Sequence, residues 1–180
     1  MSEKSLGIEE QSMRIIDSEV GIHKYNYLEW SIVRRVIHAT ADFDFAKSNG
    51  IIFSLNAIES AFQAFQKKQN IVTDVEMLLS GIKKRSLGTI GTRALCNLSN
   101  EQVIQKAKTS EKTRSALAMR YSTSSISNGI VAIGNAPTAL YELISMIREE
   151  LVKPALIIGI PVWFVSSVES KAELVSPKCE

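Results

Sequence analysis

Short, continuous apolar runs, each read as a strand and set between helical segments, constrain the fold of this chain more than any other feature. The clearest run is residues 130–133 (Ile-Val-Ala-Ile), which Gly134 ends and which a helix over about 137–149 follows. The other runs expected as strands are 71–72, 93–98 and 155–160. Unbroken apolar strands that alternate with helices indicate a parallel sheet covered on both faces. The sequence therefore predicts an α/β fold, a three-layer, doubly wound, mostly parallel sheet preceded by N-terminal helices.

The predicted helices depend on apolar spacing and on capping patterns. Residues 28–37 place five aliphatic side chains on one stripe, and residues 57–65 share an apolar face in the same way. Residues 73–76 and 99–102 each have the form of a capping box, so each is expected to open a helix. Residues 113–126 are expected to form a single helix.

Length and composition exclude several classes of protein. A chain of 180 residues with 45% hydrophobic and 22% charged residues is expected to be one globular domain, residues 1–180. No apolar run reaches the roughly 20 residues of a membrane span, and the N-terminus lacks a signal peptide, so we expect no membrane partner and a cytoplasmic location. The net charge of +2 argues against nucleic-acid binding, and the basic run 83–85 is expected to be a solvated turn.

The sequence gives no support for a metal site or for a cysteine nucleophile. The two cysteines and two histidines form no pair with metal-ligand spacing, so no metal site is predicted. Cys96 lies in an apolar alternation and is interpreted as an inert buried thiol, whereas Cys179 is next to the last residue. His23 lies in a loop-like stretch and is interpreted as a structural or surface residue.

His38 is the candidate for proton transfer. It lies near the end of the predicted helix 28–37, with Asp42 and Asp44 shortly after it. The negative end of a helix dipole and nearby carboxylates favour the protonated imidazole, which suits a general acid. A surface histidine that only caps its helix is the alternative, and the residues alone leave it open.

The segment 134–138 (Gly-Asn-Ala-Pro-Thr) is the most informative turn. Glycine permits a tight turn, Asn135 is a favoured N-cap, and Pro137 suits the first helical turn. The residues alone favour a plain strand-to-helix turn, and the alternative is that free N–H groups there face a carboxylate or phosphate. Ligands bind beyond the carboxyl ends of parallel strands, which predicts a rim formed by Asn97, 134–135 and 161–162.

Several motifs in a fixed order carry a resemblance to a known family. The motifs are 35–43 (Arg-Val-Ile-His-Ala-Thr-Ala-Asp-Phe), 113–116 (Thr-Arg-Ser-Ala), 129–140 (Gly-Ile-Val-Ala-Ile-Gly-Asn-Ala-Pro-Thr-Ala-Leu), 159–165 (Gly-Ile-Pro-Val-Trp-Phe-Val) and 169–171 (Glu-Ser-Lys). By these motifs, and by matches in the same order from about residue 8 to residue 174, the chain resembles the precorrin-8X methylmutases.

The resemblance implies an isomerase of cobalamin biosynthesis. Such enzymes move a methyl group from C11 to C12 of precorrin-8X or cobalt-precorrin-8, giving hydrogenobyrinic acid or its cobalt counterpart, and they need no separate cofactor. His38 matches the family histidine that protonates the ring C region of this corrinoid tetrapyrrole. The resemblance also implies substrate contacts from Ser12, Arg114, Asn135 and Thr138, and a homodimer in which Arg114 serves the neighbouring pocket.

The chain also departs from the family pattern. Glu9 and Gln11 stand where the family often has an aromatic residue and an arginine, and Trp163 stands in place of a glycine. Family members continue into another strand, a glycine-rich turn and a helix, so we expect a domain that is short at its C-terminus, Glu180. The alternative function is therefore corrinoid binding without catalysis, because the chain would lack the C-terminal segment that activity requires. A nucleotide-binding flavodoxin-like domain would share the architecture, but no phosphate-loop motif is present.

Overall fold

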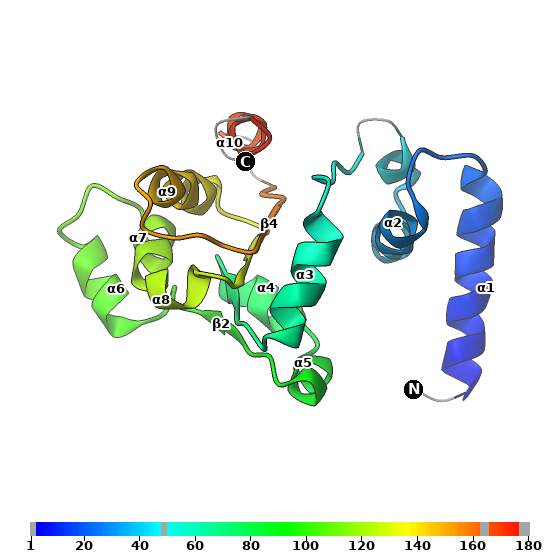
Figure 1. The fold of residues 1–180 in the computed structure, drawn as a ribbon, viewed down its shortest axis with the longest axis horizontal. Coiled ribbons are helices and arrows are strands. Elements are labelled where there is room, and N and C mark those ends of the chain that lie inside the picture. The colour runs from blue at the N-terminus through cyan, green and yellow to red at the C-terminus, as the bar shows by residue number, and fades with distance from the viewer. Residues whose placement is uncertain (1–2, 48–49, 163–165, 177–180) are drawn as a thin grey trace. The chain divides into compact units, whose positions relative to one another are not determined.

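The chain forms an α/β structure with two compact units (Figure 1). The computed structural model describes residues 3–47, 50–162 and 166–176. One unit is Met1–Ile58 and the other is Glu59–Glu180. Trp163 and the last four residues, to which the sequence drew attention, lie outside the described residues. No helix in the described ranges has both the length and the apolar character that a membrane crossing requires.

The N-terminal unit is helical. It contains α1 (Glu3–Val20), α2 (Tyr27–Thr40) and the short 3-10 helix η1 (Phe43–Ala46). Helix α2 begins at Asn26, whose side chain accepts hydrogen bonds from the backbone N–H groups of Leu28 (2.9 Å) and Glu29 (3.0 Å). The Glu29 carboxylate accepts the Asn26 N–H in return (3.0 Å), which completes a capping box. This cap explains why α2 begins one residue before the predicted 28–37 helix, and α2 also continues past that helix to Thr40.

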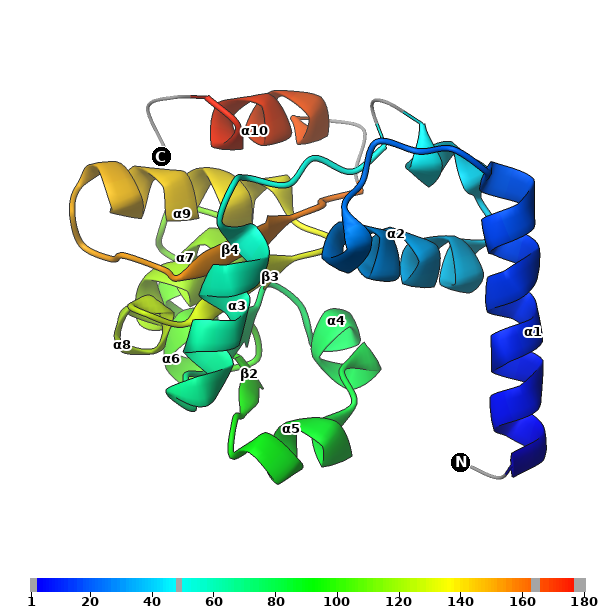
Figure 2. The ribbon, with the colours of Figure 1, turned by 45° about the vertical axis from the view of Figure 1, so that its right-hand side comes forward.

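Helices α1 and α2 contact each other around a small apolar core (Figure 2). The fully buried members of this core are Ile16, Tyr25, Val33 and Ile37. The predicted stripe of α2 is only partly confirmed, because Leu28 and Ile32 are exposed to 46% and 40%. The face that α2 buries is therefore narrower than the sequence suggested.

The second unit contains a four-stranded, all-parallel sheet, which confirms the predicted fold class. Its strands are β1 (Ile71–Thr73), β2 (Ala94–Cys96), β3 (Ile130–Ile133) and β4 (Leu156–Gly159). They lie in the order β2-β1-β3-β4. The helices of this unit are α3 (Ala57–Gln66), which begins at the end of the first unit, α4 (Glu76–Gly81), α5 (Lys84–Ile90), α6 (Glu101–Ala107), α7 (Arg114–Tyr121), α8 (Thr123–Ile126), α9 (Pro137–Arg148) and α10 (Ser167–Leu174).

Helices cover both faces of the sheet, because alternate residues of a strand point to opposite sides. On one face Val72, Val131 and Ile133 pack with buried residues of α7, α8 and α9. On the other face Ile71, Ile130 and Ala132 pack with residues of α3, α4 and α5. The strand order reverses between β1 and β3, so the ends of these two strands form the switch point at which doubly wound sheets bind ligands.

Two of the predicted capping patterns are wrong in detail. Thr73 belongs to β1, its hydroxyl lies 3.4 Å from the carbonyl oxygen of Leu95, and α4 starts later without a side-chain cap. The second helix is capped by Asn100, which accepts the Gln102 N–H at 2.9 Å, and not by the preceding serine. In both cases the pattern found the right helix, but α6 is capped by another residue and α4 has no side-chain cap.

Two further expectations differ from the structure. The predicted helix 113–126 is divided at Ser122, whose hydroxyl donates to the Ala118 carbonyl at 2.7 Å, so it forms the separate helices α7 and α8. The basic run 83–85 is solvated, as expected, but it starts α5 and does not form a turn.

An ion-pair network joins α7 to α9. Glu142 is nearly buried and pairs with Lys112 (2.6 Å) and with Nε of Arg120. The same guanidinium donates two parallel hydrogen bonds to Glu149, at 3.0 and 2.8 Å. These bonds and one from the Ser145 hydroxyl (2.7 Å) lower the pKa of the Glu149 carboxyl from 4.5 to about 2.

The lowered pKa of Glu149 predicts a pH-dependent contribution to stability. A carboxyl with a lower pKa in the folded state stabilises the protein above its unfolded pKa, and this contribution is lost as the pH falls toward the folded pKa. Wild type should therefore melt at a higher temperature than Glu149→Gln at pH 7, and the gap should close between about pH 5 and pH 2. Thermal unfolding of both proteins, followed by circular dichroism, measures this difference in melting temperature. The exposed Glu150→Gln is the control. A gap that is unchanged near pH 2 would contradict the assignment.

Candidate active site

Two of the predicted site residues contact each other in the N-terminal unit. The hydroxyl oxygen of Ser12 on α1 lies 2.8 Å from Nδ1 of His38 on α2. His38 lies in the last turn of α2, next to the buried Ile37, and its side chain is exposed. The core that α1 and α2 share brings these helices together, so the packing of Ile16 against Val33 and Ile37 positions the pair.

The Ser12 contact has a direct chemical consequence. A serine hydroxyl can donate or accept a hydrogen bond, so it satisfies Nδ1 in either tautomer of the imidazole and in the imidazolium. The contact orients the ring and leaves Nε2 as the nitrogen available to a substrate. The predicted acid therefore has a second residue that holds it in place.

The two carboxylates that follow His38 in sequence have other partners. Asp42 accepts the N–H of Asp44 at 2.9 Å and caps η1. Asp44 pairs with Lys47 at 2.6 Å. Neither carboxylate is bonded to His38 within the described part of the chain, so the sequence proximity does not become a contact.

A second polar contact between α1 and α2 joins Glu9 to Arg35. These residues lie one turn before Ser12 and His38 on their helices, so the two pairs are neighbours. The Arg35 side chain is 64% exposed, whereas that of Glu9 is 22% exposed. Sequence reasoning singled out Glu9 as a departure from the family but gave no partner for it, since only the packing of the helices reveals one.

In the second unit, the candidate anion-binding turn is occupied by an acid of the protein itself. Asp74, fully buried at the end of β1, accepts N–H bonds from Gly134 (3.2 Å), Asn135 (2.8 Å) and Ala136 (2.6 Å). These N–H groups are therefore used inside the protein, which agrees with the plain strand-to-helix turn that the residues favoured and excludes the alternative of an anion site. The N-cap of α9 is Ala136, without a side-chain bond, and not Asn135, whereas Pro137 takes the first helical position as expected.

Thr138 and Arg114 lie at the N-terminal ends of α9 and α7. The hydroxyl groups of Thr113 and Thr138 are hydrogen-bonded at 2.9 Å, which joins the two helix ends. Thr113 also caps α7 by accepting the N–H of Ala116 at 3.3 Å. Arg114 is exposed and makes no hydrogen bond or ion pair with the residues that the structure describes. Its guanidinium is thus available for a bidentate contact with a carboxylate.

The remaining predicted rim residues make internal contacts. The Asn97 side chain donates to the Ser122 hydroxyl at 2.9 Å. The carbonyl of Pro161 accepts the Ser167 hydroxyl at 2.7 Å. The structure thus brings Ser12 and His38 together in one unit, and it gathers Asn135, Thr138 and Arg114 on the second.

Asp74 is the residue at this rim that sequence reasoning missed. Its signal was an acidic residue directly after a buried strand, at the switch point of a parallel sheet. The capping-box pattern at 73–76 concealed this signal, because it assigned the segment to a helix start.

Comparison with known proteins gives consistent matches over nearly the whole chain. A profile of the precorrin-8X methylmutase family matches residues 7–180. The cobalt-precorrin-8 methylmutase of Leptospira interrogans is 45% identical over 170 residues, covering 93% of this chain and 76% of that protein. The protein of the same name from Priestia megaterium is 40% identical over 167 residues, covering 93% and 73%. The crystal structure of precorrin-8X methyl mutase from Thermus thermophilus is 37% identical with a TM-score of 0.85, covering 93% and 80%.

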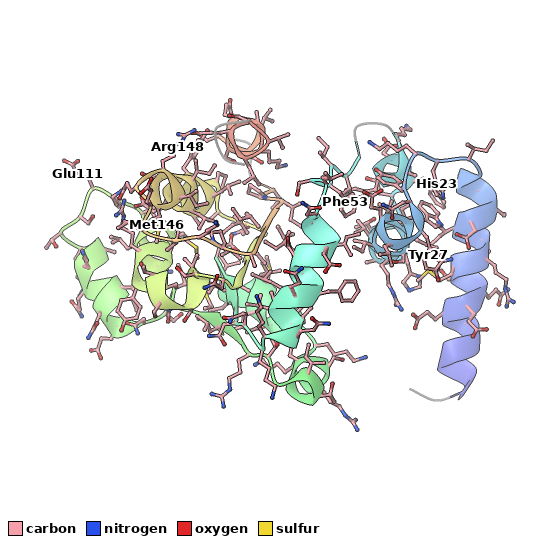
Figure 3. All side chains as sticks on the ribbon, in the orientation of Figure 1. His23, Tyr27, Phe53, Glu111, Met146 and Arg148 are labelled. Carbon is pink, nitrogen blue, oxygen red and sulfur yellow. The ribbon has the colours of Figure 1, made fainter. Side chains whose placement is uncertain are left out.

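The Asp74 contacts predict a loss of stability in Asp74→Asn. An amide offers one acceptor oxygen and an NH₂ group that cannot accept the backbone N–H bonds, so at least one buried donor loses its charged partner. The free energy of unfolding should fall by about 2 kcal/mol. Urea unfolding followed by circular dichroism measures it. The exposed Glu111→Gln, marked in Figure 3, is the control, and equal midpoints for the two variants would refute the role of Asp74.

Proposed function

This chain belongs to the precorrin-8X methylmutase family and is an isomerase of cobalamin biosynthesis, and we propose that His38 is the acid that promotes its reaction. In the proposed reaction a methyl group migrates from C11 to C12 of precorrin-8X or cobalt-precorrin-8. The relatives carry both substrate names, so both forms are candidates. We propose that residues 1–180 act as one isomerase domain without a separate cofactor.

The observation that carries the proposal is the contact between Ser12 and His38. An intramolecular migration needs a held substrate and one well-placed proton, and it needs neither a nucleophile nor a metal. We propose that Nδ1 of His38 stays bonded to Ser12 while Nε2 gives its proton to the ring C region. Because the reaction is an isomerisation, the macrocycle loses one proton in return. Ser12 thus acts by orienting His38.

The substrate carries acetate and propionate carboxylates, and we propose that Arg114, Asn135 and Thr138 bind some of them. The exposed guanidinium of Arg114 suits a bidentate contact with one carboxylate. Asp74 fixes the backbone of Asn135, and Thr113 fixes the hydroxyl of Thr138, so both donors are pre-positioned. This pre-positioning lowers the conformational cost of binding.

The proposal predicts that His38→Ala nearly abolishes conversion. Loss of a general acid should slow the reaction by on the order of 10² to 10⁴. Ser12→Ala should slow it by about tenfold, because the imidazole loses the hydrogen bond that orients it. Single-turnover absorbance under anaerobic conditions, with both precorrin-8X and its cobalt form, measures the rates. Ser18→Ala, an exposed serine on the same helix, should convert like wild type.

Two outcomes would contradict the assignment of this chain as an isomerase with His38 as its acid. Equal rates for wild type and His38→Ala would remove the histidine from the mechanism. A spectral change on binding without conversion by wild type would favour the alternative, a corrinoid-binding protein without turnover.

We also propose a cytoplasmic homodimer in which Arg114 completes the pocket of the neighbouring subunit, as the resemblance to the family implies. His38→Ala and Arg114→Ala would each inactivate both pockets of their own dimers. Mixed dimers would hold one intact pocket, so random exchange should restore about a quarter of the wild-type activity. Activity assays after subunit exchange measure it, and a pull-down with two different tags verifies that mixed dimers form. Mixed dimers without activity would contradict the shared pocket.

A further inference from the structure

A cavity of about 280 Å³ lies on the N-terminal unit. The end of α1, the following loop and α2 line this cavity, and Figure 3 marks His23 and Tyr27 there. The lining residues that matter here are Asp17, His23, Tyr27, Trp30, Ser31 and Arg34. None of these residues has a role in the function proposed above.

A network of polar contacts fixes the wall of this cavity. Both oxygens of the Asp17 carboxylate are used: one accepts Nη1–H of Arg34 at 2.7 Å, and the other accepts the Trp30 indole N–H at 2.9 Å. The His23 ring stacks on Trp30, with ring centroids 4.0 Å apart and planes 20° apart. These four side chains are therefore held in place before any ligand arrives.

Two buried polar atoms of this wall have no partner within the described residues. They are Nε of Arg34 and Nδ1 of His23. Leaving such atoms unsatisfied costs free energy, so buried polar atoms without protein partners indicate strain, an ordered water or a ligand. Here both belong to side chains that line the same cavity, which favours a ligand.

The chemistry of the two atoms selects an anion. The Arg34 Nε–H can only donate, and it lies on the edge of the guanidinium that binds carboxylates with two parallel hydrogen bonds. Nδ1 of His23 can donate as well. Each oxygen of Asp17 already accepts a hydrogen bond, one of them from the Arg34 guanidinium, so its negative charge is compensated within the wall of the cavity.

From these contacts we propose that Arg34 and His23 form a carboxylate subsite that takes one acetate or propionate arm of the corrinoid substrate. This inference rests on the proposed function. The cavity has room for a side arm but not for the macrocycle. Arg34 and His38 are four residues apart on α2, which places both on one face of the helix with their Cβ atoms about 5–6 Å apart. An arm held by Arg34 would thus bring the ring itself close to His38.

Two substitutions separate binding from folding. Arg34→Lys keeps a positive charge beside Asp17 but removes Nε–H and the planar edge. His23→Phe keeps an aromatic ring on Trp30 but removes Nδ1. Arg14→Lys, at an exposed arginine of α1 outside the cavity, is the matched control.

Absorbance titration with hydrogenobyrinic acid, the expected product, measures the effect. Arg34→Lys should weaken binding by about tenfold or more, and His23→Phe by severalfold, whereas Arg14→Lys stays within about twofold of wild type. KM should rise in the first two variants with a smaller change in kcat. Unchanged binding and KM in both variants would overturn the subsite, including the case in which only their melting temperatures fall.

A second titration keeps this inference separable from the proposed function. If wild type neither binds nor converts a corrinoid, the proposed function fails, and glutarate then tests the carboxylate subsite alone. In a Trp163→Phe background, glutarate should change the fluorescence of Trp30, and Arg34→Lys should abolish the change. No change with glutarate in that case would overturn the subsite, and a change with inorganic phosphate but not glutarate would reassign it to another anion.

Discussion

The architecture of the second unit depends on the contact between the buried Asp74 carboxylate and the backbone N–H groups of residues 134–136. A charge in the interior is tolerated only when hydrogen bonds compensate it, and three backbone N–H groups of the turn after β3 do so. The contact ties the end of β1 to the start of α9. It thereby fixes Thr138, which bonds to Thr113 and joins α9 to α7. The rim of the sheet is thus positioned by an internal anion.

The N-terminal unit follows the same principle with contacts between helices. Four polar contacts hold α1 against α2: Ser12 with His38, Glu9 with Arg35, and Asp17 with both Trp30 and Arg34. They surround the apolar core and set the rotation of each helix about its axis. The orientation of His38 is therefore set by contacts within this unit.

The strands could be predicted from the sequence because burial on both faces leaves a local, unbroken apolar pattern, as at 130–133. The other local patterns, at 73–76 and 134–138, could not be interpreted from sequence alone because tertiary contacts determine the structure there. The alternative of an anion site at the turn is excluded only by the tertiary structure, because the anion there is Asp74, 60 residues before Gly134. The capping box at 73–76 failed because the same contact holds Asp74 and keeps Thr73 in the strand. The resemblance identified Ser12 and His38, but their hydrogen bond follows from helix packing, which no short pattern encodes.

Following the migrating methyl group itself would test the central claim most directly. Precorrin-8X carrying ¹³C in its C11 methyl group would be incubated with the purified chain, and carbon NMR would locate the label. The account predicts that the label moves to C12 with wild type and remains at C11 with His38→Ala. A label that moves equally well in both, or that stays at C11 in wild type although the corrinoid binds, would contradict it.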